Sequence, residues 1–465
     1  MATIVDGVKR LQENGIKVIV IGAGVAGLQA ALECWRKGCN VVVIEKDEKL
    51  SSIGDFFTIG PSGSTTVKDF PSMHSDYHKC VYDCSMDLYT PSGTEIFSMS
   101  PEWKEYSGKG VAPDVDISFL KRRSEYARMQ VDQAERLHIP IHWADKFGVE
   151  VTTASGKKFD GDLYIGASGI GSTVPGFDFG SQVAVQDSGY AIARVAFPRT
   201  AVPEGSLASE LVRAADSRPR FRTYIGNNIH LILYLTPNWL GFAFTHPDLN
   251  SAKESWGDLK DPSTLIHFLE EANASWDPAV LDFVRAAPSG VVDWKLRWRD
   301  GAEQWTSSNG RLVLMGDAAH AFFPTSGNDA TQGIEDAVSL AECLSIGGKD
   351  GVVQATKVHN KLRFERVNIL QLLGFVNREE LHNADVEAIM ADKTKAKIGY
   401  FTLGSWSWNH DPEAKCLAHL TDGKPFQYTN VPPGHAYQPW TLESENKRLK
   451  DGAKSDLKSN GYWGM

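Results

Sequence analysis

Residues 17–45 read KVIVIGAGVAGLQAALECWRKGCNVVVIE and contain the pattern that decides the fold. A short β-rich run, from Lys17 to Ile21, leads into three glycines spaced G-x-G-x-x-G, and apolar residues then recur at helical spacing. A second apolar run, from Val41 to Ile44, ends in the acidic residue Glu45. A strand, a glycine turn, an amphipathic helix, a second strand and an acid in this order predict a β-α-β unit that binds a dinucleotide.

The glycines and the acid each have a physical reason to occur in that unit. Gly22 permits a tight turn, Gly24 lets the backbone approach a pyrophosphate, and Gly27 lets the helix pack closely on the strand. The phosphates would meet the free N–H groups at the helix N-terminus, where the helix dipole also favours anions. Glu45 can accept hydrogen bonds from a ribose diol, and the adjacent Lys46 is a further candidate for cofactor binding.

The composition fits a globular protein and excludes some function classes. The 465 residues are 42% hydrophobic and 23% charged, which suits two domains or one large α/β body with an inserted module. A net charge of −10 argues against a general nucleic-acid binder. No stretch has the ~20 apolar residues that a transmembrane helix needs, and the N-terminus lacks the apolar core of a signal peptide. The six scattered cysteines favour a reduced, cytoplasmic protein.

Residue types that bind metals cluster between His74 and Cys84. Cys80 and Cys84 follow His74 and His78 at short spacing. These side chains can bind zinc, but a structural zinc site needs a second Cys/His pair, which is missing nearby. We expect no metal in this protein, and a site at this cluster stays the alternative.

The secondary-structure pattern changes along the chain and predicts an α/β fold. Residues 15–180 and 300–380 form one discontinuous, Rossmann-like nucleotide-binding domain in this prediction. Residues 181–299 form an inserted, mostly antiparallel β-sheet domain that would bind substrate. Residues 381–465 form a C-terminal extension of helices and irregular segments, and its polar end, from Thr441, is expected to be a loose tail.

A second motif lies far along the chain, at residues 311–344, which read RLVLMGDAAHAFFPTSGNDATQGIEDAVSLAECL. A strand ends at Gly316 and Asp317, and Gly327 precedes a helix. Together with the first β-α-β unit and the strand-rich insert, this order resembles the class A FAD-dependent flavoprotein monooxygenases, the aromatic hydroxylase or salicylate hydroxylase-like family. The spelling GDFF at residues 54–57 and the tryptophan-rich C-terminal region look like fungal members, which often belong to secondary-metabolite pathways.

The resemblance implies FAD as the cofactor and adds residues that would bind it. Asp317 would accept hydrogen bonds from the ribityl chain, and the helix near Gly327 would point its N–H groups at the flavin N1–C2=O edge. Arg123 matches the family arginine that reaches the pyrophosphate and ribityl region, although Arg122 is an alternative. The chain departs from the family in three places, where Ser168 replaces an aspartate, Pro175 an arginine and Asp329 a glycine.

The resemblance also implies a reaction. Family members reduce FAD with NADPH or NADH, react it with O2, and transfer oxygen from a flavin C4a-hydroperoxide to an electron-rich carbon. We therefore expect hydroxylation or epoxidation of an aromatic, indole-like or alkaloid-like small molecule by a monomer or homodimer. Two polar residues are candidates for catalytic roles: Arg194, on an otherwise apolar strand, and Asp55, beside two phenylalanines. They are candidates for pairing with each other, and a purely structural ion pair is the competing interpretation.

Aromatic side chains on the inserted sheet and near Asp55 are candidates for the substrate pocket, although such residues are more often core. These are Phe56, Phe57, Tyr224, Tyr234, Phe242, Phe244 and Phe323. His320 is expected to be a structural hydrogen-bonding residue rather than a base.

Other functions share part of the pattern. The departures at Ser168 and Pro175 are compatible with an FAD-containing oxidase, reductase or cyclase on the same fold. A non-enzymatic binder on an FAD-type fold is disfavoured because the glycines and acids that would bind the cofactor are all present. A flavin halogenase is disfavoured because the Trp-Ser-Trp triplet at residues 406–408 lies near the C-terminus, far from that family's tryptophan motif.

Overall fold

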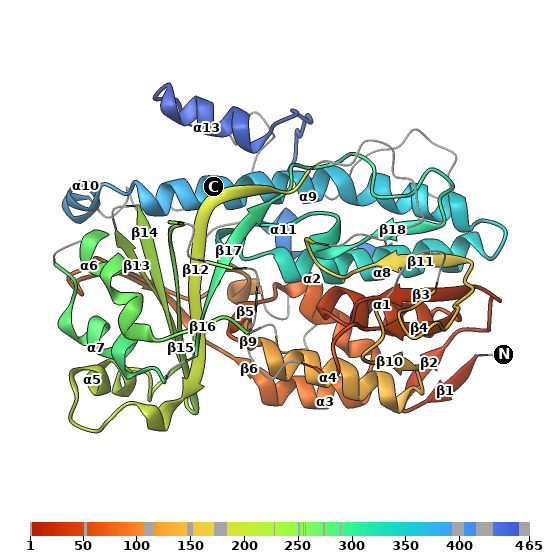
Figure 1. Cartoon of the computed structure of the whole chain (residues 1–465), viewed down its shortest axis with the longest axis horizontal. Helices are drawn as coiled ribbons and strands as arrows, with labels where there is room; N and C mark the ends of the chain where they lie inside the picture. The colour runs from red at the N-terminus through yellow and green to blue at the C-terminus, as the bar shows by residue number, and fades with distance from the viewer. Residues whose placement is uncertain are drawn as a thin grey trace.

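Two large sheets stand side by side along the long axis of the molecule (Figure 1). One is a five-stranded parallel sheet and the other an eight-stranded, mostly antiparallel sheet. This mixed α/β architecture confirms the predicted fold class. The computed structural model describes residues 2–50, 54–106, 116, 118–146, 152–171, 184–226, 228–249, 252–253, 255, 257–272, 275–288, 290–392, 404–414 and 431–454.

The parallel sheet is built around the first motif. Its strand order is β10-β4-β3-β11-β18. The strands are β3 (Lys17–Ile21), β4 (Asn40–Ile44), β10 (Ile141–His142), β11 (Leu163–Gly166) and β18 (Leu312–Leu314). Helix α1 (Val25–Arg36) connects β3 to β4, which is the predicted β-α-β unit. The two segments of the predicted nucleotide-binding domain, residues 15–180 and 300–380, therefore meet in one sheet, since β11 pairs with both β3 and β18.

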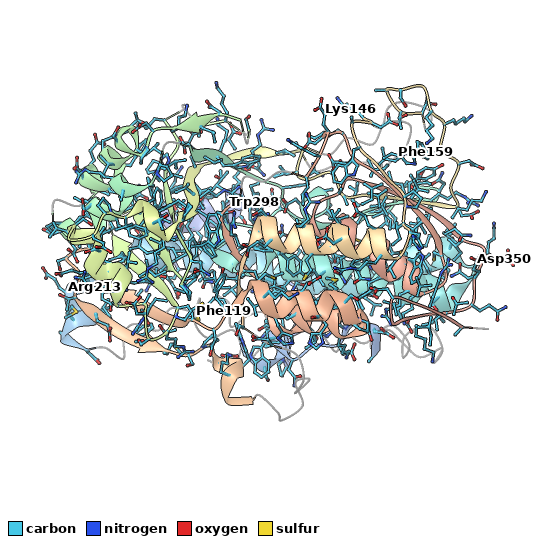
Figure 2. All side chains as sticks on the ribbon, turned by 90° about the horizontal axis from the view of Figure 1, so that it is seen from below. Phe119, Lys146, Phe159, Arg213, Trp298 and Asp350 are labelled. Carbon is cyan, nitrogen blue, oxygen red and sulfur yellow. The ribbon has the colours of Figure 1, made fainter. Side chains whose placement is uncertain are left out.

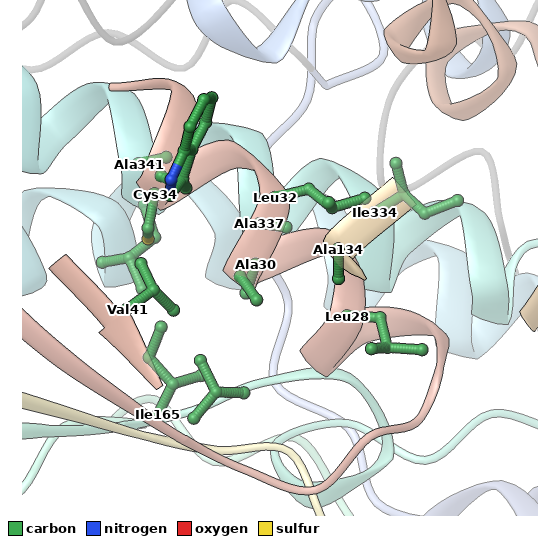
Figure 3. Packing of buried hydrophobic residues seen from close by; sticks show 14 of the residues in the cluster. Leu28, Ala30, Leu32, Cys34, Val41, Ala134, Ile165, Ile334, Ala337 and Ala341 are labelled. Atoms are coloured by element: carbon green, nitrogen blue, oxygen red, sulfur yellow. The ribbon is translucent and has the colours of Figure 1, made fainter. Parts of the chain in front are cut away.

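Helix α1 is buried because the sheet covers one side of it and two helices cover the other. These helices are α4 (Arg123–Arg136) and α8 (Asp329–Gly347). Small residues on α8 allow the close approach, and Figure 3 shows the apolar side chains that fill this core. The labelled residues are Leu28, Ala30, Leu32 and Cys34 of α1, Val41 and Ile165 of the sheet, Ala134 of α4, and Ile334, Ala337 and Ala341 of α8. This packing fixes the glycine turn at the start of α1 against α8.

The second sheet has the strand order β16-β17-β12-β15-β14-β13-β7-β8. Its strands are β7 (Ser85–Tyr89), β8 (Glu95–Met99), β12 (Gln186–Pro198), β13 (Arg220–Gly226), β14 (Ile229–Leu235), β15 (Trp239–Pro247), β16 (Leu259–Lys260) and β17 (Val291–Trp298). Helices α5 (Leu207–Arg213), α6 (Ile266–Ala272) and α7 (Pro278–Ala286) pack on it. Strand β7 pairs in parallel with β13, so this sheet takes two strands from outside the predicted insert, residues 181–299. The predicted domain limits themselves stay a prediction.

A small three-stranded sheet is formed by strands that lie between β4 and β10 in the sequence. It contains β5 (Phe56–Thr58), β9 (Leu120–Arg122) and β6 (Val81–Tyr82). The helices α2 (Pro61–Ser64) and α3 (Pro71–Cys80) lie between β5 and β6, and the 3-10 helix η2 (Glu102–Tyr106) follows β8. At the N-terminus, β1 (Thr3–Val5) and β2 (Val8–Arg10) form a hairpin.

The long helix α9 (Val352–His382) runs past both large sheets, contacting α8 at one end and β13 and β14 at the other (Figure 1). The C-terminal extension then adds α10 (Val386–Ala391), α11 (Ser405–Trp408) and α13 (Leu442–Lys450). The expectation of a loose tail from Thr441 is wrong for α13. Thr441 and Ser444 form a capping box, and the Leu442 N–H donates to Asp300 Oδ1 at 2.8 Å. Among the helices that the structure describes, none is long and apolar enough to cross a membrane.

Candidate functional site

The first and third glycines of the motif are required by packing, whereas the second is open. A Cβ on Gly22, whose φ is +111°, would lie 2.5 Å from the Ala167 carbonyl oxygen. A Cβ on Gly27 would lie 2.1 Å from the Gly22 carbonyl oxygen. Gly24 is exposed, and the nearest atom to its Cβ position is 4.0 Å away. The turn therefore has a tight interior and an open outer side at the N-terminus of α1, which fits a pyrophosphate.

Glu45 lies beside this turn, at the end of β4. Its Oε2 accepts a hydrogen bond from the Ala23 N–H at 2.6 Å, and its Oε1 accepts one from the Asp47 N–H at 3.0 Å. The carboxylate is half-buried, and Lys46 next to it is exposed. Glu45 is thus held at the glycine turn, where a ribose diol would meet it. The ribose contact of Glu45 and the cofactor contact of Lys46 stay predictions.

Asp317 lies on a 3-10 turn, η6 (Gly316–Ala318), directly after β18, and is exposed. The turn packs against α1 and α8, because Cβ atoms placed on Gly316 and Gly333 would both lie 3.0 Å from the Ala26 Cβ. The turn that carries Asp317, in the second motif, thus packs against α1, the helix of the first motif. The Asp317 side chain is exposed, and its contact with the ribityl chain stays a prediction.

Gly327 ends the 3-10 helix η7 (Pro324–Ser326) in the left-handed conformation, with φ +60°, just before α8. The loop is tied to the segment after Asp55. The Thr58 hydroxyl donates to the Gly327 carbonyl oxygen at 2.9 Å, and the Gly60 N–H donates to the Thr331 hydroxyl at 2.9 Å. These bonds fix the N-terminus of α8, whose N–H groups would face the flavin.

Asp55 is buried and bridges two arginines. Its Oδ1 is 3.4 Å from Arg123 Nε, and its Oδ2 is 3.4 Å from Arg194 Nη1. The predicted Asp55–Arg194 pair is therefore present, and Arg123 joins it. Arg122 instead pairs with Glu125 at 2.8 Å and stacks on an indole ring of the sheet. Arg123 therefore belongs to the Asp55 cluster and Arg122 does not, and the cofactor contact of either arginine stays a prediction.

Burial and neighbouring charges change the protonation of this group. Burial lowers the pKa of Arg194, Asp55 opposes that shift, and Arg123 adds to it. Burial raises the pKa of Asp329 well above its ordinary value, and the Asp317 carboxylate raises it further, while Arg123 opposes the shift. The neutral form of Asp329 is therefore favoured. Its protonation removes the charge conflict that a carboxylate at the start of α8 would have with a reduced flavin.

The buried polar residues behind the loop are structural. His320 and Asp336 share a hydrogen bond of 2.5 Å, and Arg363 Nε donates to Asp336 Oδ1 at 2.7 Å. The arginine and the histidine hold the pKa of Asp336 well below its usual range despite burial. His320 is 1% exposed, which agrees with the expected structural role and not with that of a base.

Sequence reasoning missed Arg299, which connects the second motif to the middle one. Its Nη1 donates to the Ala318 carbonyl oxygen at 2.9 Å, and its Nη2 donates to the Ile170 carbonyl oxygen at 3.0 Å. The only signal in the sequence was a charged residue just after a strand-like run. Of the two departures in the middle motif, Ser168 is described, and Pro175 lies outside the described residues.

A pocket adjoins the Gly327 loop, and its empty space of about 550 Å³ includes open solvent. Its lining comes from segments far apart in the sequence: Thr58, Gly60, Ser62, Met86, Trp103, Phe119, Ser326, Gly327, Asn328, Ser407 and Trp408. Among these described residues, none is charged. Figure 2 shows Phe119 near the middle of the long axis, with Arg213 and Asp350 towards opposite ends. The pocket thus lies near the junction of the two large sheets.

The aromatic residues expected at a pocket are not those found at this one. Its described lining contains Trp103, Phe119 and Trp408 and none of the seven aromatic residues suggested by the sequence. Several of those pack in cores; Phe56, for example, contacts Tyr234 with ring centres 5.1 Å apart. The tryptophan-rich C-terminal region was a signal for Trp408, but nothing in the sequence placed it near the other lining residues.

The described residues contain no group of three or more candidate metal ligands. The alternative of a metal site at Cys80 and Cys84 is therefore not supported. Both cysteines are buried as free thiols. His74 and His78 contact each other, with 3.1 Å between their Nε2 atoms.

Comparison with known proteins agrees with the geometry. Two protein-family models, both described as an FAD binding domain, match residues 17–58 and 258–349. The FAD-dependent monooxygenase fsr3 of Gibberella fujikuroi is 36% identical over 98% of this chain and 90% of that protein. The FAD-dependent monooxygenase mdpD of Emericella nidulans is 33% identical over 98% of this chain and 91% of that protein.

Solved structures show the same fold. CtdE in complex with FAD and substrate 4 superposes with a TM-score of 0.77 at 25% identity, over 87% of this chain and 97% of CtdE. FqzB superposes with a TM-score of 0.77 at 23% identity, over 92% of this chain and 99% of FqzB. The open glycine turn, the accessible Asp317 and the Arg123 guanidinium fit FAD. This oxidoreductase belongs to the class A FAD-dependent flavoprotein monooxygenases, and the relatives that show this are fungal.

Proposed function

We propose that this enzyme uses NADPH or NADH and O2 to hydroxylate or epoxidise an aromatic, indole-like or alkaloid-like natural product. The observation that carries this proposal is the pocket beside Gly327, which combines aromatic walls with hydroxyl groups and has an uncharged described lining. Such a lining suits a flat, neutral molecule with a few polar substituents. The names of the relatives and the substrate complex of CtdE support oxygen transfer to a small molecule.

The chain's own residues would bind and orient FAD. Gly24 and the N-terminus of α1 would bind the pyrophosphate, and Glu45 a ribose. Arg123 and Asp317 would hold the phosphate and ribityl region, and the N–H groups that follow Gly327 would stabilise negative charge at the pyrimidine edge. When bound, FAD would supply the redox chemistry, for which the family resemblance implies oxygen transfer from a C4a-hydroperoxide.

Arg194 and Asp55 would act on the substrate side. Asp55 is 5% exposed and holds guanidinium groups of Arg123 and Arg194 at equal distances of 3.4 Å. A guanidinium fixed in this way can donate a hydrogen bond to a substrate oxygen without reorienting, and it can stabilise charge that develops there. Asp55 would set the direction in which Arg194 donates.

Arg194→Ala tests this assignment. The variant should retain bound FAD, since other residues are proposed to contact the cofactor. It should no longer form oxygenated product. Flavin absorbance of the purified protein measures the first property, and product analysis after mixing with NADPH in air measures the second. Arg122→Ala is the matched control, because Arg122 lies outside the Asp55 cluster, and it should keep turnover. Full turnover in Arg194→Ala would exclude the proposed role.

An FAD-containing oxidase, reductase or cyclase is the second candidate, motivated by Ser168 and Pro175 in the middle motif. Anaerobic mixing with NADPH or NADH separates the two. Substrate-stimulated bleaching of the flavin, followed by oxygenated product in air, supports the monooxygenase. A flavin that stays oxidised across a broad aromatic panel favours a redox-neutral role such as that of a cyclase, and peroxide release without oxygenated product favours an oxidase. The cytoplasmic location and the monomeric or homodimeric state stay predictions from the sequence.

A further inference from the structure

The C-terminal helix α11 supplies part of the pocket wall. Ser407 and Trp408 line the pocket together with Gly327, although they lie beyond the predicted substrate domain. Trp408 is 4% exposed and belongs to the same apolar cluster as Met86, Trp103 and Phe119. The pocket therefore has an apolar side completed by Trp408 and a polar side that includes the Gly327 loop.

Trp408 is held in place by a hydrogen bond to a segment that also lines the pocket. Its indole Nε1–H donates to Glu102 Oε1. Glu102 is on η2, next to Trp103, which also lines the pocket. A bond to a carboxylate is stronger than a neutral one and fixes the plane of the indole ring. The bond therefore joins α11 to η2, two pocket segments that are 306 residues apart in sequence.

A second connection holds α11 from behind. Arg366 Nη2 donates to the Ser407 carbonyl oxygen at 2.7 Å and to Glu335 Oε1 at 2.8 Å. Glu335 Oε1 also accepts from the Ser62 hydroxyl at 2.7 Å. Arg366 and Glu335 are both fully buried. Since Ser62 and Ser407 both line the pocket, this buried chain of four residues joins the wall after β5 to the wall made by α11.

We propose that Trp408 is a specificity-determining residue, which contacts the aromatic rings of the substrate and is positioned by Glu102 and, through Ser407, by Arg366. This inference rests on the proposed function and names the element that selects its substrate. A preoriented indole loses little conformational entropy when a flat ring packs on it, and aromatic pairs attract beyond simple area burial. Loss of either anchor would let α11 shift and would weaken binding of large rings more than small ones.

Binding of neutral aromatic probes to the FAD-loaded enzyme tests the inference, with perturbation of the flavin spectrum as the readout. The probes are 1-naphthol, indole and phenol. We expect Trp408→Ala to weaken 1-naphthol binding by about tenfold or more, which is about 1.4 kcal/mol, with a smaller effect on phenol. Trp408→Phe keeps an aromatic ring but removes the N–H donor, and it should weaken 1-naphthol binding by a few-fold.

Two further variants separate positioning from folding. Glu102→Gln keeps an acceptor for the indole but removes its charge, and it should give an effect in the same direction as Trp408→Phe. Trp406→Phe is the matched control, because Trp406 is on the same helix and does not line the pocket, and phenylalanine keeps an aromatic ring for the contact with Arg366. Its affinity for 1-naphthol should stay within about twofold of the wild type. Thermal unfolding of each variant shows whether the fold is retained.

The outcomes distinguish this inference from the proposed function. Equal binding of 1-naphthol by the wild type, Trp408→Phe and Glu102→Gln would overturn it, as would a wild type that binds none of the probes. An equally large loss in Trp406→Phe would also overturn it, since the effect would then report the stability of α11. If the probes bind as expected but no aromatic compound is oxygenated with NADPH and O2, the proposed function fails and the role of Trp408 stands.

Discussion

The glycine turn that would bind the pyrophosphate forms a cofactor cradle, and the pocket beside Gly327 is built in the opposite way. The cradle comes from one continuous segment, residues 17–45, in which Gly27 packs on Gly22, and Gly22 packs on Ala167, directly after the adjacent strand β11. The pocket takes its walls from segments between Thr58 and Trp408, which meet only in the folded chain. A site built locally leaves a spacing pattern in the sequence, because the backbone geometry repeats. A site assembled from distant segments leaves none.

The two regions also differ in what holds them together. The cradle is fixed by close backbone contact, such as the 2.1 Å that a Cβ on Gly27 would leave to the Gly22 carbonyl oxygen. The pocket is fixed by buried polar side chains, among them Lys121, Glu335 and Arg366. Substitutions should therefore act on the cradle through steric clash and on the pocket through lost hydrogen bonds and changed protonation.

The largest effect is expected at Gly27. Gly27→Ala should destabilise the protein by about 3 kcal/mol or more, because its methyl group would overlap backbone atoms that cannot move aside easily. Gly24→Ala is the matched control, with no neighbour closer than 4.0 Å, and it should leave the stability of the apoprotein nearly unchanged while weakening FAD binding. Urea unfolding of the apoproteins and FAD titration measure the two properties. Equal stability of the two variants would contradict the contrast between the tight interior and the open outer side of the turn.

The next effect is expected at Lys121, which braces the pocket walls, and over any single pH unit it is smaller than the effect at Gly27. Its ammonium donates to the Ser118 carbonyl oxygen at 2.5 Å and to the Ile59 carbonyl oxygen at 3.2 Å, next to the lining residues Phe119 and Gly60. Burial lowers the pKa of Lys121 to about 7. Between this value and the ordinary lysine pKa of about 10.4, the unfolded state binds more protons than the folded state, so stability rises with pH.

Lys121→Met should remove this dependence. Relative to the variant, the wild type should gain up to about 1.4 kcal/mol of stability for each pH unit within that window. Urea unfolding from about pH 6 to pH 10 measures the difference between the two proteins and cancels the groups that they share. Parallel pH profiles would mean that Lys121 keeps its ordinary pKa and that the bracing is not pH-sensitive.

The smallest effect is expected at Lys46, beside the cradle. Lys46 is exposed, so Lys46→Ala should change the free energy of unfolding by less than about 0.5 kcal/mol. If Lys46 contacts the cofactor, FAD affinity should fall and the loss should shrink at high salt, as expected for an exposed charge. If Lys46→Ala leaves the FAD affinity unchanged at low salt, Lys46 does not belong to the cofactor site.

Much of the fold followed from the sequence, because the signals were local. The β-α-β unit, the strand before Asp317 and the helix after Gly327 appeared where periodicity and glycine spacing predicted them. The pairing of Asp55 with Arg194 was suggested by polar residues in apolar surroundings. The capped helix α13 was not expected, since its polar surface reads as a tail and its stability depends on contacts such as Leu442 with Asp300.

The sequence by itself determined the family and the cofactor, and it predicted residues that would bind that cofactor, since these signals lie in short segments with fixed backbone geometry. Only the tertiary structure decided that β7 joins the second sheet, that Arg123 rather than Arg122 meets Asp55, and that Trp408 reaches the pocket. Each of these is a contact between segments that are distant in sequence. The physical reason is that such contacts depend on how whole sheets and helices pack, which no local spacing of residue types encodes.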